Sequence, residues 1–185
     1  MDSAQTLIDA RWVRKVRMGN ADAFGKLYLK YIDPIYRFVY YKVGQDKDIA
    51  EDLTETVFFK AWKSVGSLKD NKANIRAWFY KIARNTVIDY FRTKDESVSL
   101  DEAIDAKDNG KTLEEKIHEK LTIEKIKQEM KNLTGIQREV IILRFIEGLS
   151  CKEAGEILNK DEASVRAIQY RGIQELRKNM DINKK

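Results

Sequence analysis

The most specific pattern in this chain is the stretch CKEAGEILNKDEASVRAIQY, residues 151–170. Just before and within it, Ser150 and Glu153 have the spacing of a capping box, which predicts a helix that begins directly after the serine. Asn159 stands where a tight turn needs a left-handed backbone, which Asn adopts more readily than most residues. Asp161 is placed to cap a following helix. The stretch therefore predicts two short helices joined by a turn.

The packing residues of this stretch match a helix-turn-helix. Gly155 is small where the two helix axes must approach, and Leu158, Val165 and Ile168 supply apolar side chains to the inner face. Such a unit can place its second helix in the major groove of DNA. An ordinary helical hairpin with solvated charges is the alternative. Lys160 departs from the pattern, because an apolar residue is usual there, although its stem can still cover apolar surface.

Several polar side chains of the second helix and its turn face outward in this arrangement. The first of them would meet base edges, and the later cations would meet phosphates. The candidate DNA contacts are Lys160, Glu162, Ser164, Arg166, Gln169, Tyr170 and Arg171.

Composition predicts an all-α protein with two small helical domains. The 185 residues include one proline and nine glycines, and 35% of them are charged. Such a scarcity of helix breakers favours helices throughout. Residues 97–119 are acidic, lack an apolar period and contain Asp108-Asn109-Gly110, a strong turn signal. We therefore expect domains over 1–96 and 120–185, with a flexible acidic linker between them.

Apolar spacing predicts the individual helices. The first has large apolar residues over 24–39, and Asp33-Pro34 should kink or restart it. The further expected helices cover about 48–65, 74–93, 121–130 and 136–146, and Gly148 should end the last of these.

The chain offers little material for catalysis or metal binding. It has one cysteine, Cys151, one histidine, His118, and a net charge of +5. No glycine-rich phosphate loop and no nucleophilic or metal-binding constellation is present in the sequence, so we expect no enzyme, no cofactor and no metal. Without a signal peptide or an apolar run of about 20 residues, a cytoplasmic protein without membrane insertion is expected.

The motif blocks resemble a known family. Residues 137–150, QREVIILRFIEGLS, resemble the opening of sigma domain four, and the helix-turn-helix follows at the proper distance. The chain resembles sigma domain two at residues 19–24, 50–58, 77–78 and 82–85, and at Asp89 and Arg92. The absence of a third domain is typical of extracytoplasmic-function (ECF) sigma factors of RNA polymerase. Thr54-Glu55-Thr56, Gly155 and Gly172 depart from the usual residues of the family.

This resemblance implies three contact surfaces. The helix-turn-helix would read the minus-thirty-five promoter element. An acidic face would dock on the clamp coiled coil of the largest subunit of core polymerase, although a solvated charge run looks the same, and its residues are Asp48, Glu51, Asp52 and Glu55. The third helix and its preceding loop would recognise and melt minus-ten DNA, and the candidate residues are Lys72, Asn74, Arg76, Trp78, Phe79, Lys81, Arg84, Asn85 and Arg92.

Two alternatives stay open for the aromatic residues and the linker. Trp78 and Phe79 either stack on unpaired bases, which is worth about 1–3 kcal/mol per base, or belong to the core. The acidic linker either is a solvated tether or follows the nucleic-acid path inside the polymerase.

An anti-sigma factor is the further partner that the resemblance implies. A stand-alone DNA-binding regulator would need only residues 120–180, which leaves the first block unexplained.

Overall fold

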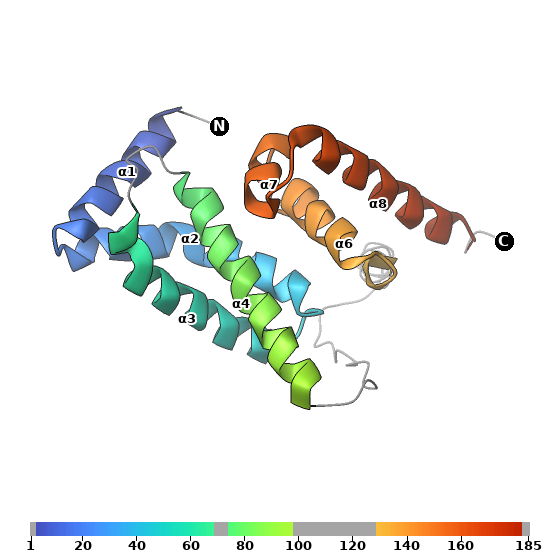
Figure 1. Ribbon diagram of the computed structural model, residues 1–185, viewed down its shortest axis with the longest axis horizontal. Helices are drawn as coiled ribbons and strands as arrows, with labels where there is room; N and C mark the ends of the chain where they lie inside the picture. The colour runs from blue at the N-terminus through green and yellow to red at the C-terminus, as the bar shows by residue number, and fades with distance from the viewer. Residues whose placement is uncertain (1–2, 69–73, 98–128, 183–185) are drawn as a thin grey trace, which may run out of the picture. The chain divides into compact units, whose positions relative to one another are not determined.

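The structure is a computed structural model that describes residues 3–68, 74–97 and 129–182. These residues form two compact units, which are treated separately here. Every regular element among them is helical (Figure 1). The first unit contains α1 (Ser3–Arg17), α2 (Ala21–Lys42), α3 (Lys47–Ser64), the short 3-10 turn η1 (Val65–Ser67) and α4 (Ile75–Ser97). The second contains α6 (Gly135–Ile141), the π-helical turn η2 (Ile142–Ile146), α7 (Cys151–Leu158) and α8 (Glu162–Ile182).

Helix α2 is the centre of the first unit, because α1, α3 and α4 all pack against it (Figure 1). Its buried residues recur at helical spacing and include Leu27, Ile35 and Phe38. Aromatic rings fill the space between the helices. Phe79 of α4 stacks on Tyr31 of α2, with the ring centroids 4.8 Å apart. The apolar residues that recur at helical spacing in the sequence thus form the core of this unit.

The restart of the helix that Asp33-Pro34 could have produced does not occur. The helix is continuous from Ala21 to Lys42 with the proline inside it. Pro34 has no amide hydrogen to donate, and proline in a helix interior costs about 3 kcal/mol. Tyr31 and Phe38, one turn before and one turn after, are both buried. Burial on both sides of the proline keeps the two halves in one helix despite that cost.

Helix α1 was not expected as a separate element. Its inward residues, Asp9, Val13 and Val16, follow helical spacing, but the polar first member hides the pattern. The carboxylate of Asp9 accepts a hydrogen bond from the Tyr31 hydroxyl at 2.5 Å and pairs with Lys30 Nζ at 2.5 Å. Burial, together with the bond to Asp9, raises the pKa of Tyr31. A buried polar cluster therefore fastens α1 to α2.

The second unit packs α6 and α7 against α8. Fully buried Val140, Leu143, Ile157 and Val165 form its core. The expected helix over 136–146 is present as α6 followed by η2, and the Glu147 amide donates back to the Ile142 carbonyl five residues earlier at 3.0 Å. Gly148 follows with a positive φ of 64°, which confirms it as the stop signal.

The remaining helix boundaries follow the sequence expectations to within four residues. The helix expected over 48–65 is Lys47–Ser64, and the one expected over 74–93 is Ile75–Ser97. Except for Ser97, which ends α4, the linker expected over 97–119 lies outside the described residues, as does most of the helix expected over 121–130. Within the residues that are described, no helix is long and apolar enough to cross a membrane.

Candidate nucleic-acid and polymerase interfaces

The turn between α7 and α8 has the backbone that the sequence predicts. Asn159 lies in the left-handed region at φ 52° and ψ 48°, and its amide and that of Lys160 both donate to the Gly155 carbonyl. A Cβ on Gly155 would lie 2.5 Å from the Lys160 carbonyl oxygen. The glycine is therefore needed for close approach, as expected, but the neighbour is the backbone of the turn and not the partner helix.

Both helices of the motif are capped by the expected residues. The Ser150 hydroxyl accepts from the Glu153 amide at 3.2 Å, while the Glu153 carboxylate accepts from the Ser150 amide at 2.8 Å. The Asp161 carboxylate accepts from the Ser164 amide at 2.7 Å. This bond lowers the pKa of Asp161. These local bonds hold the two ends that meet at the turn, so the start of α8 is fixed.

The face of α8 that is turned away from the core carries the candidate DNA contacts. Val165 and Ile168 are buried, as expected, and opposite them Glu162, Arg166 and Tyr170 follow at successive turns, all exposed. Ser164 and Gln169 are half-buried, and Lys160 and Arg171 are exposed.

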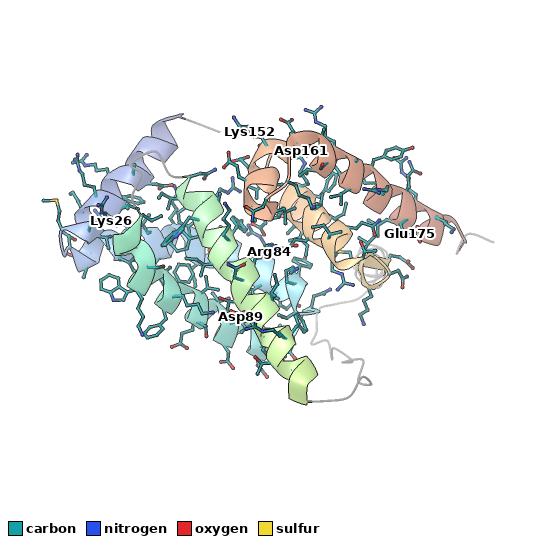
Figure 2. The ribbon with its side chains drawn as sticks, viewed as in Figure 1. Lys26, Arg84, Asp89, Lys152, Asp161 and Glu175 are labelled. Carbon is teal, nitrogen blue, oxygen red and sulfur yellow. The ribbon has the colours of Figure 1, made fainter. Side chains whose placement is uncertain are left out.

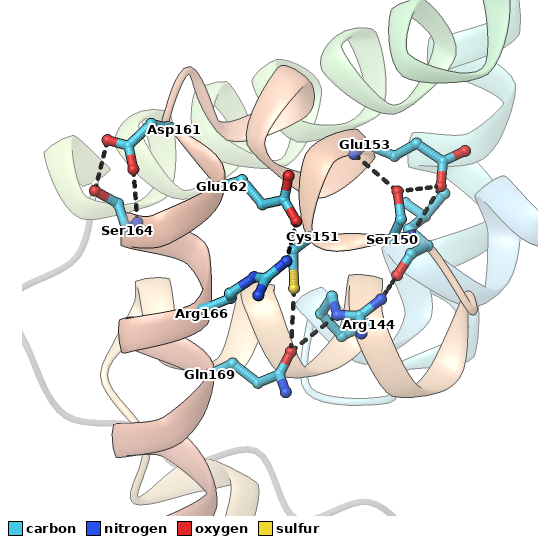
Figure 3. Close-up of polar contacts among 10 residues, drawn as sticks. Arg144, Ser150, Cys151, Glu153, Asp161, Glu162, Ser164, Arg166 and Gln169 are labelled. Atoms are coloured by element: carbon cyan, nitrogen blue, oxygen red, sulfur yellow. Dashed lines mark hydrogen bonds and ion pairs between the residues drawn. The ribbon is translucent and has the colours of Figure 1, made fainter.

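Two members of this face are already paired with each other. The Arg166 guanidinium donates to the Glu162 carboxylate across one turn at 2.5 Å (Figure 3). That bond raises the pKa of Arg166. The start of α8 therefore presents one cation and one carboxylate side by side.

A second polar cluster lies behind the outward face. Arg144 of η2 donates from Nε to the amide oxygen of Gln169 at 2.9 Å and from its terminal nitrogen to the Leu149 carbonyl (Figure 3). The Cys151 sulfur lies 3.7 Å from the same Gln169 oxygen. Residues 25 positions apart in the chain thus meet at the middle of α8.

Helix α4 has an exposed stripe of polar and aromatic residues. Trp78, Lys81, Asn85 and Arg92 are spaced three, four and seven apart, which places them on one face, and they are half-buried or exposed. Arg92 pairs with Asp89 at 3.3 Å, and Lys60 of α3 approaches the same carboxylate at 3.5 Å. Figure 2 shows Arg84 and Asp89 on this helix. Arg84 and Arg76 are half-buried.

Two of the residues expected to contact minus-ten DNA have roles in the fold itself, one in the core and one as a helix cap. Phe79 is 0% exposed and packs against the rings of Tyr31 and Phe58, so it belongs to the core and cannot meet a base in this conformation. Its assignment to DNA contact is therefore corrected. The Asn74 side chain accepts from the Ala77 amide at 3.1 Å and so caps α4. Lys72 lies outside the described residues.

The acidic residues of α3 lie on one exposed face. Asp48, Glu51, Asp52 and Glu55 are all exposed, while Ala50, Thr54 and Val57 are buried. Burial and the charges of Glu51 and Asp48 raise the pKa of Tyr36 on α2. Among the described residues, no group of three or more His, Cys, Asp or Glu side chains has the arrangement of a metal site.

The family model "Sigma-70 region 2" matches residues 27–96, and "Sigma-70, region 4" matches residues 129–178. The ECF RNA polymerase sigma factor BldN of Streptomyces coelicolor is 35% identical over 89% of this chain, which spans 62% of BldN's own length. The ECF RNA polymerase sigma factor SigX of Bacillus subtilis is 31% identical over 87% of this chain and 85% of its own.

The chain belongs to the ECF family of RNA polymerase sigma factors. A sigma factor binds core RNA polymerase and recognises minus-thirty-five and minus-ten promoter DNA, and this directs promoter-specific transcription initiation. Sigma factors catalyse no reaction themselves.

The fold is shared with a solved sigma factor. RpoE of Bartonella quintana, determined in complex with the anti-sigma factor NepR, is 21% identical to this sigma factor. It superimposes with a TM-score of 0.68 over 87% of this chain and 98% of that chain. At this identity the likeness concerns the fold.

Sequence reasoning missed the polar cluster of Arg144, Cys151 and Gln169 that lies against α8 of this sigma factor. Arg144 was read only as part of the run over 137–150, and Cys151 only as a lone thiol. The one signal available was that an arginine stands among Ile142, Leu143 and Phe145, where a buried or half-buried guanidinium needs acceptors. Its partner could not be named from the sequence, because the contact joins separate helices.

Proposed function

We propose that α8 reads the minus-thirty-five element through the side chains on its outward face. The observation that carries this proposal is a fully capped helix-turn-helix whose second helix exposes polar side chains opposite a buried apolar row. Early side chains of such a helix meet base edges in the major groove, and later cations meet phosphates. The proposed contacts are Lys160, Glu162, Ser164, Arg166, Gln169, Tyr170 and Arg171.

We propose that the exposed stripe of α4 captures the melted minus-ten strand. Trp78 is half-buried, with its ring edge-on to Phe79 at 4.9 Å, so part of the indole surface is open to a base. Lys81, Asn85 and Arg92 continue the same face and suit a phosphate backbone. Arg76, Arg84, Asn74 and Lys72 complete the proposed surface, and Phe79 is left out because it is buried.

We propose that the acidic face of α3 docks on the clamp coiled coil of the largest polymerase subunit. Four carboxylates on one exposed face, with no apolar role, favour a partner surface of positive charge. If this face is only solvated, reversing its charges should affect transcription no more than reversing other exposed charges of the same unit.

The remaining features of the proposal concern the whole chain. Its domains are residues 1–96 and 120–185 with a linker over 97–119, it acts in the cytoplasm, and it makes no chemical bond and uses no cofactor. RpoE is described in complex with an anti-sigma factor, and we propose a partner of that class for this chain.

In vitro transcription with purified core polymerase and a promoter library tests the proposal. The chain should produce transcripts from a defined subset of promoters. The double reversal Glu51→Lys with Glu55→Lys should abolish them, whereas the matched reversal Asp22→Lys with Asp33→Lys, at exposed positions of α2, should leave them in place. Transcription without promoter preference would contradict the function. Equal activity of the two double variants would contradict docking through α3.

A further inference from the structure

The amide of Gln169 is oriented before any DNA is present. Its oxygen accepts a hydrogen bond from Arg144 Nε at 2.9 Å and lies 3.7 Å from the Cys151 sulfur. A guanidinium has five donors and no acceptor, and a thiol is a weak donor. Only the oxygen of the amide can therefore face this pair, and the nitrogen must face away from it (Figure 3).

The donor that orients the amide is itself anchored. Arg144 donates to the Leu149 carbonyl as well as to Gln169, and it is half-buried between η2 and α8. Two hydrogen bonds from one planar group fix both its position and its plane. Gln169 is half-buried as well, so its side chain has little freedom to turn over. The orientation is a property of the folded second unit.

We propose that Gln169 presents only N–H donors to the major groove and for this reason selects guanine over adenine at one position of the upstream promoter element. This inference rests on the proposed function of α8. Guanine offers two acceptors in the major groove, O6 and N7, whereas adenine offers the N7 acceptor beside the N6 amino donor. The usual bidentate pairing of Gln with adenine needs the amide oxygen, which Arg144 and Cys151 occupy here.

The charged side chains that precede Gln169 on this face do not supply the missing acceptor at this position. Arg166, one turn earlier on the same face, also has only donors, and Glu162, the carboxylate that pairs with it, lies two turns before Gln169. A donor-only surface at Gln169 is thus followed toward the start of α8 by one carboxylate, that of Glu162. This order favours guanine at the position that Gln169 contacts.

The test uses full-length protein with core polymerase on promoters randomised over the upstream element, with transcript counts for each sequence. Wild type should prefer guanine to adenine about tenfold at one position, toward the lower part of the range for a specific base contact. Gln169→Met should remove the preference at that position alone. Arg144→Met should free the amide to turn over and reduce the preference to about threefold or less, since adenine then becomes a partner. Gln174→Met, at an exposed position further along α8, is the matched control and should change nothing.

A second variant keeps the test decisive if Arg144→Met fails to fold. Gln169→Glu retains the partner of Arg144 but turns an acceptor toward the groove, so cytosine should replace guanine at the same position. An even loss of transcription on all sequences with Gln169→Met would indicate a phosphate contact and overturn the inference. So would a guanine preference that stays at about tenfold in folded Arg144→Met, or a guanine preference of any size that persists in Gln169→Glu. A wild-type protein with no preference at any upstream position would instead overturn the proposed function of α8.

Discussion

Replacing Gly155 and Gly172 with alanine should have opposite effects on the stability of the second unit. Both glycines are buried inside helices, where alanine is favoured over glycine by about 1 kcal/mol. They differ in what a Cβ would meet. At Gly155 it would lie 2.5 Å from the Lys160 carbonyl oxygen, which belongs to the backbone of the turn. At Gly172 it would lie 3.4 Å from the Ile141 side chain, an ordinary van der Waals contact.

The magnitudes follow from these distances. Gly172→Ala should stabilise the unit by about 1 kcal/mol, the helix-propensity gain alone. Gly155→Ala gains the same amount but must displace the turn, and overpacking of this kind costs roughly 1–3 kcal/mol. With a steric cost near the middle of that range, about 2 kcal/mol, Gly155→Ala should destabilise by about 1 kcal/mol. The two variants should therefore differ by about 2 kcal/mol.

Urea unfolding separates this effect from changes elsewhere in the chain. All three tryptophans, Trp12, Trp62 and Trp78, belong to the first unit, so their fluorescence reports on that unit, while circular dichroism reports on both. With an m-value of about 1 kcal/mol/M, each variant should shift the circular-dichroism midpoint of the second unit by about 1 M, in opposite directions. If Gly155→Ala stabilises as much as Gly172→Ala, the reasoning from the 2.5 Å contact is wrong.

Four further predictions concern the contact of Asp9 with α2, the proposed DNA contacts and the helix cap at Asp161. Asp9→Ala should lower the free energy of unfolding by about 3 kcal/mol, because it leaves the buried Tyr31 hydroxyl and the half-buried Lys30 ammonium without their carboxylate, and fluorescence-detected unfolding measures this. Arg166→Ala should weaken binding to the upstream element roughly tenfold and relax base selectivity, as footprinting would show. Trp78→Ala should impair open-complex formation, detected by permanganate reactivity, more than initial duplex binding. Asp161→Ala should lower the thermal midpoint at pH 7, and the difference from wild type should shrink below about pH 4.

The sign of the last prediction follows from the pKa of Asp161, which the Ser164 amide lowers in the folded state. A carboxylate with a lowered pKa stabilises the fold above its unfolded pKa, and this contribution is lost as the pH falls through the folded value. Asp161→Asn keeps a capping side chain without the charge, so its midpoint should not share this pH dependence. A constant difference between wild type and Asp161→Ala down to pH 2 would contradict the assignment.

The other three predictions have matched controls. Asp33→Ala removes an exposed carboxylate of α2 and should leave stability within about 0.5 kcal/mol. Arg177→Ala removes an exposed cation late on α8, and equal loss of selectivity there would count against a special role for Arg166. For Trp78→Ala, circular dichroism must show a folded first unit, and a loss confined to duplex binding would contradict the melting role.

The helix-turn-helix could be predicted from the sequence because its determinants are local. The capping box, the left-handed Asn159 and the cap at Asp161 each involve residues no more than three positions apart, and the structure confirms all of them. The close approach at Gly155 was expected as well, although the contacting atom was not. Local hydrogen bonds can be read from spacing alone.

The features that the sequence predicted wrongly or not at all depend instead on tertiary packing. Pro34 was read by its local preference, but burial of α2 on both sides of it overrides that preference. Among the adjacent rings of Trp78, Phe79 and Tyr80, only the packing of α4 on α2 and α3 decides that Phe79 is core and Trp78 partly open. The contact of Arg144 with Gln169 likewise depends on how separate helices meet.

That contact also bears on how such proteins can be recombined. The proposed DNA contacts belong to α8 and the turn before it, but the arginine that holds Gln169 lies upstream on η2, where the Glu147 amide bonds to a carbonyl five residues earlier. Deleting one residue from that wider turn would rotate Arg144 by about 100° and carry it away from α8. A chimaera joined between Gly148 and Ser150 would inherit α8 without Arg144. Exchange of promoter preference between relatives should therefore succeed only when the junction is placed before residue 142.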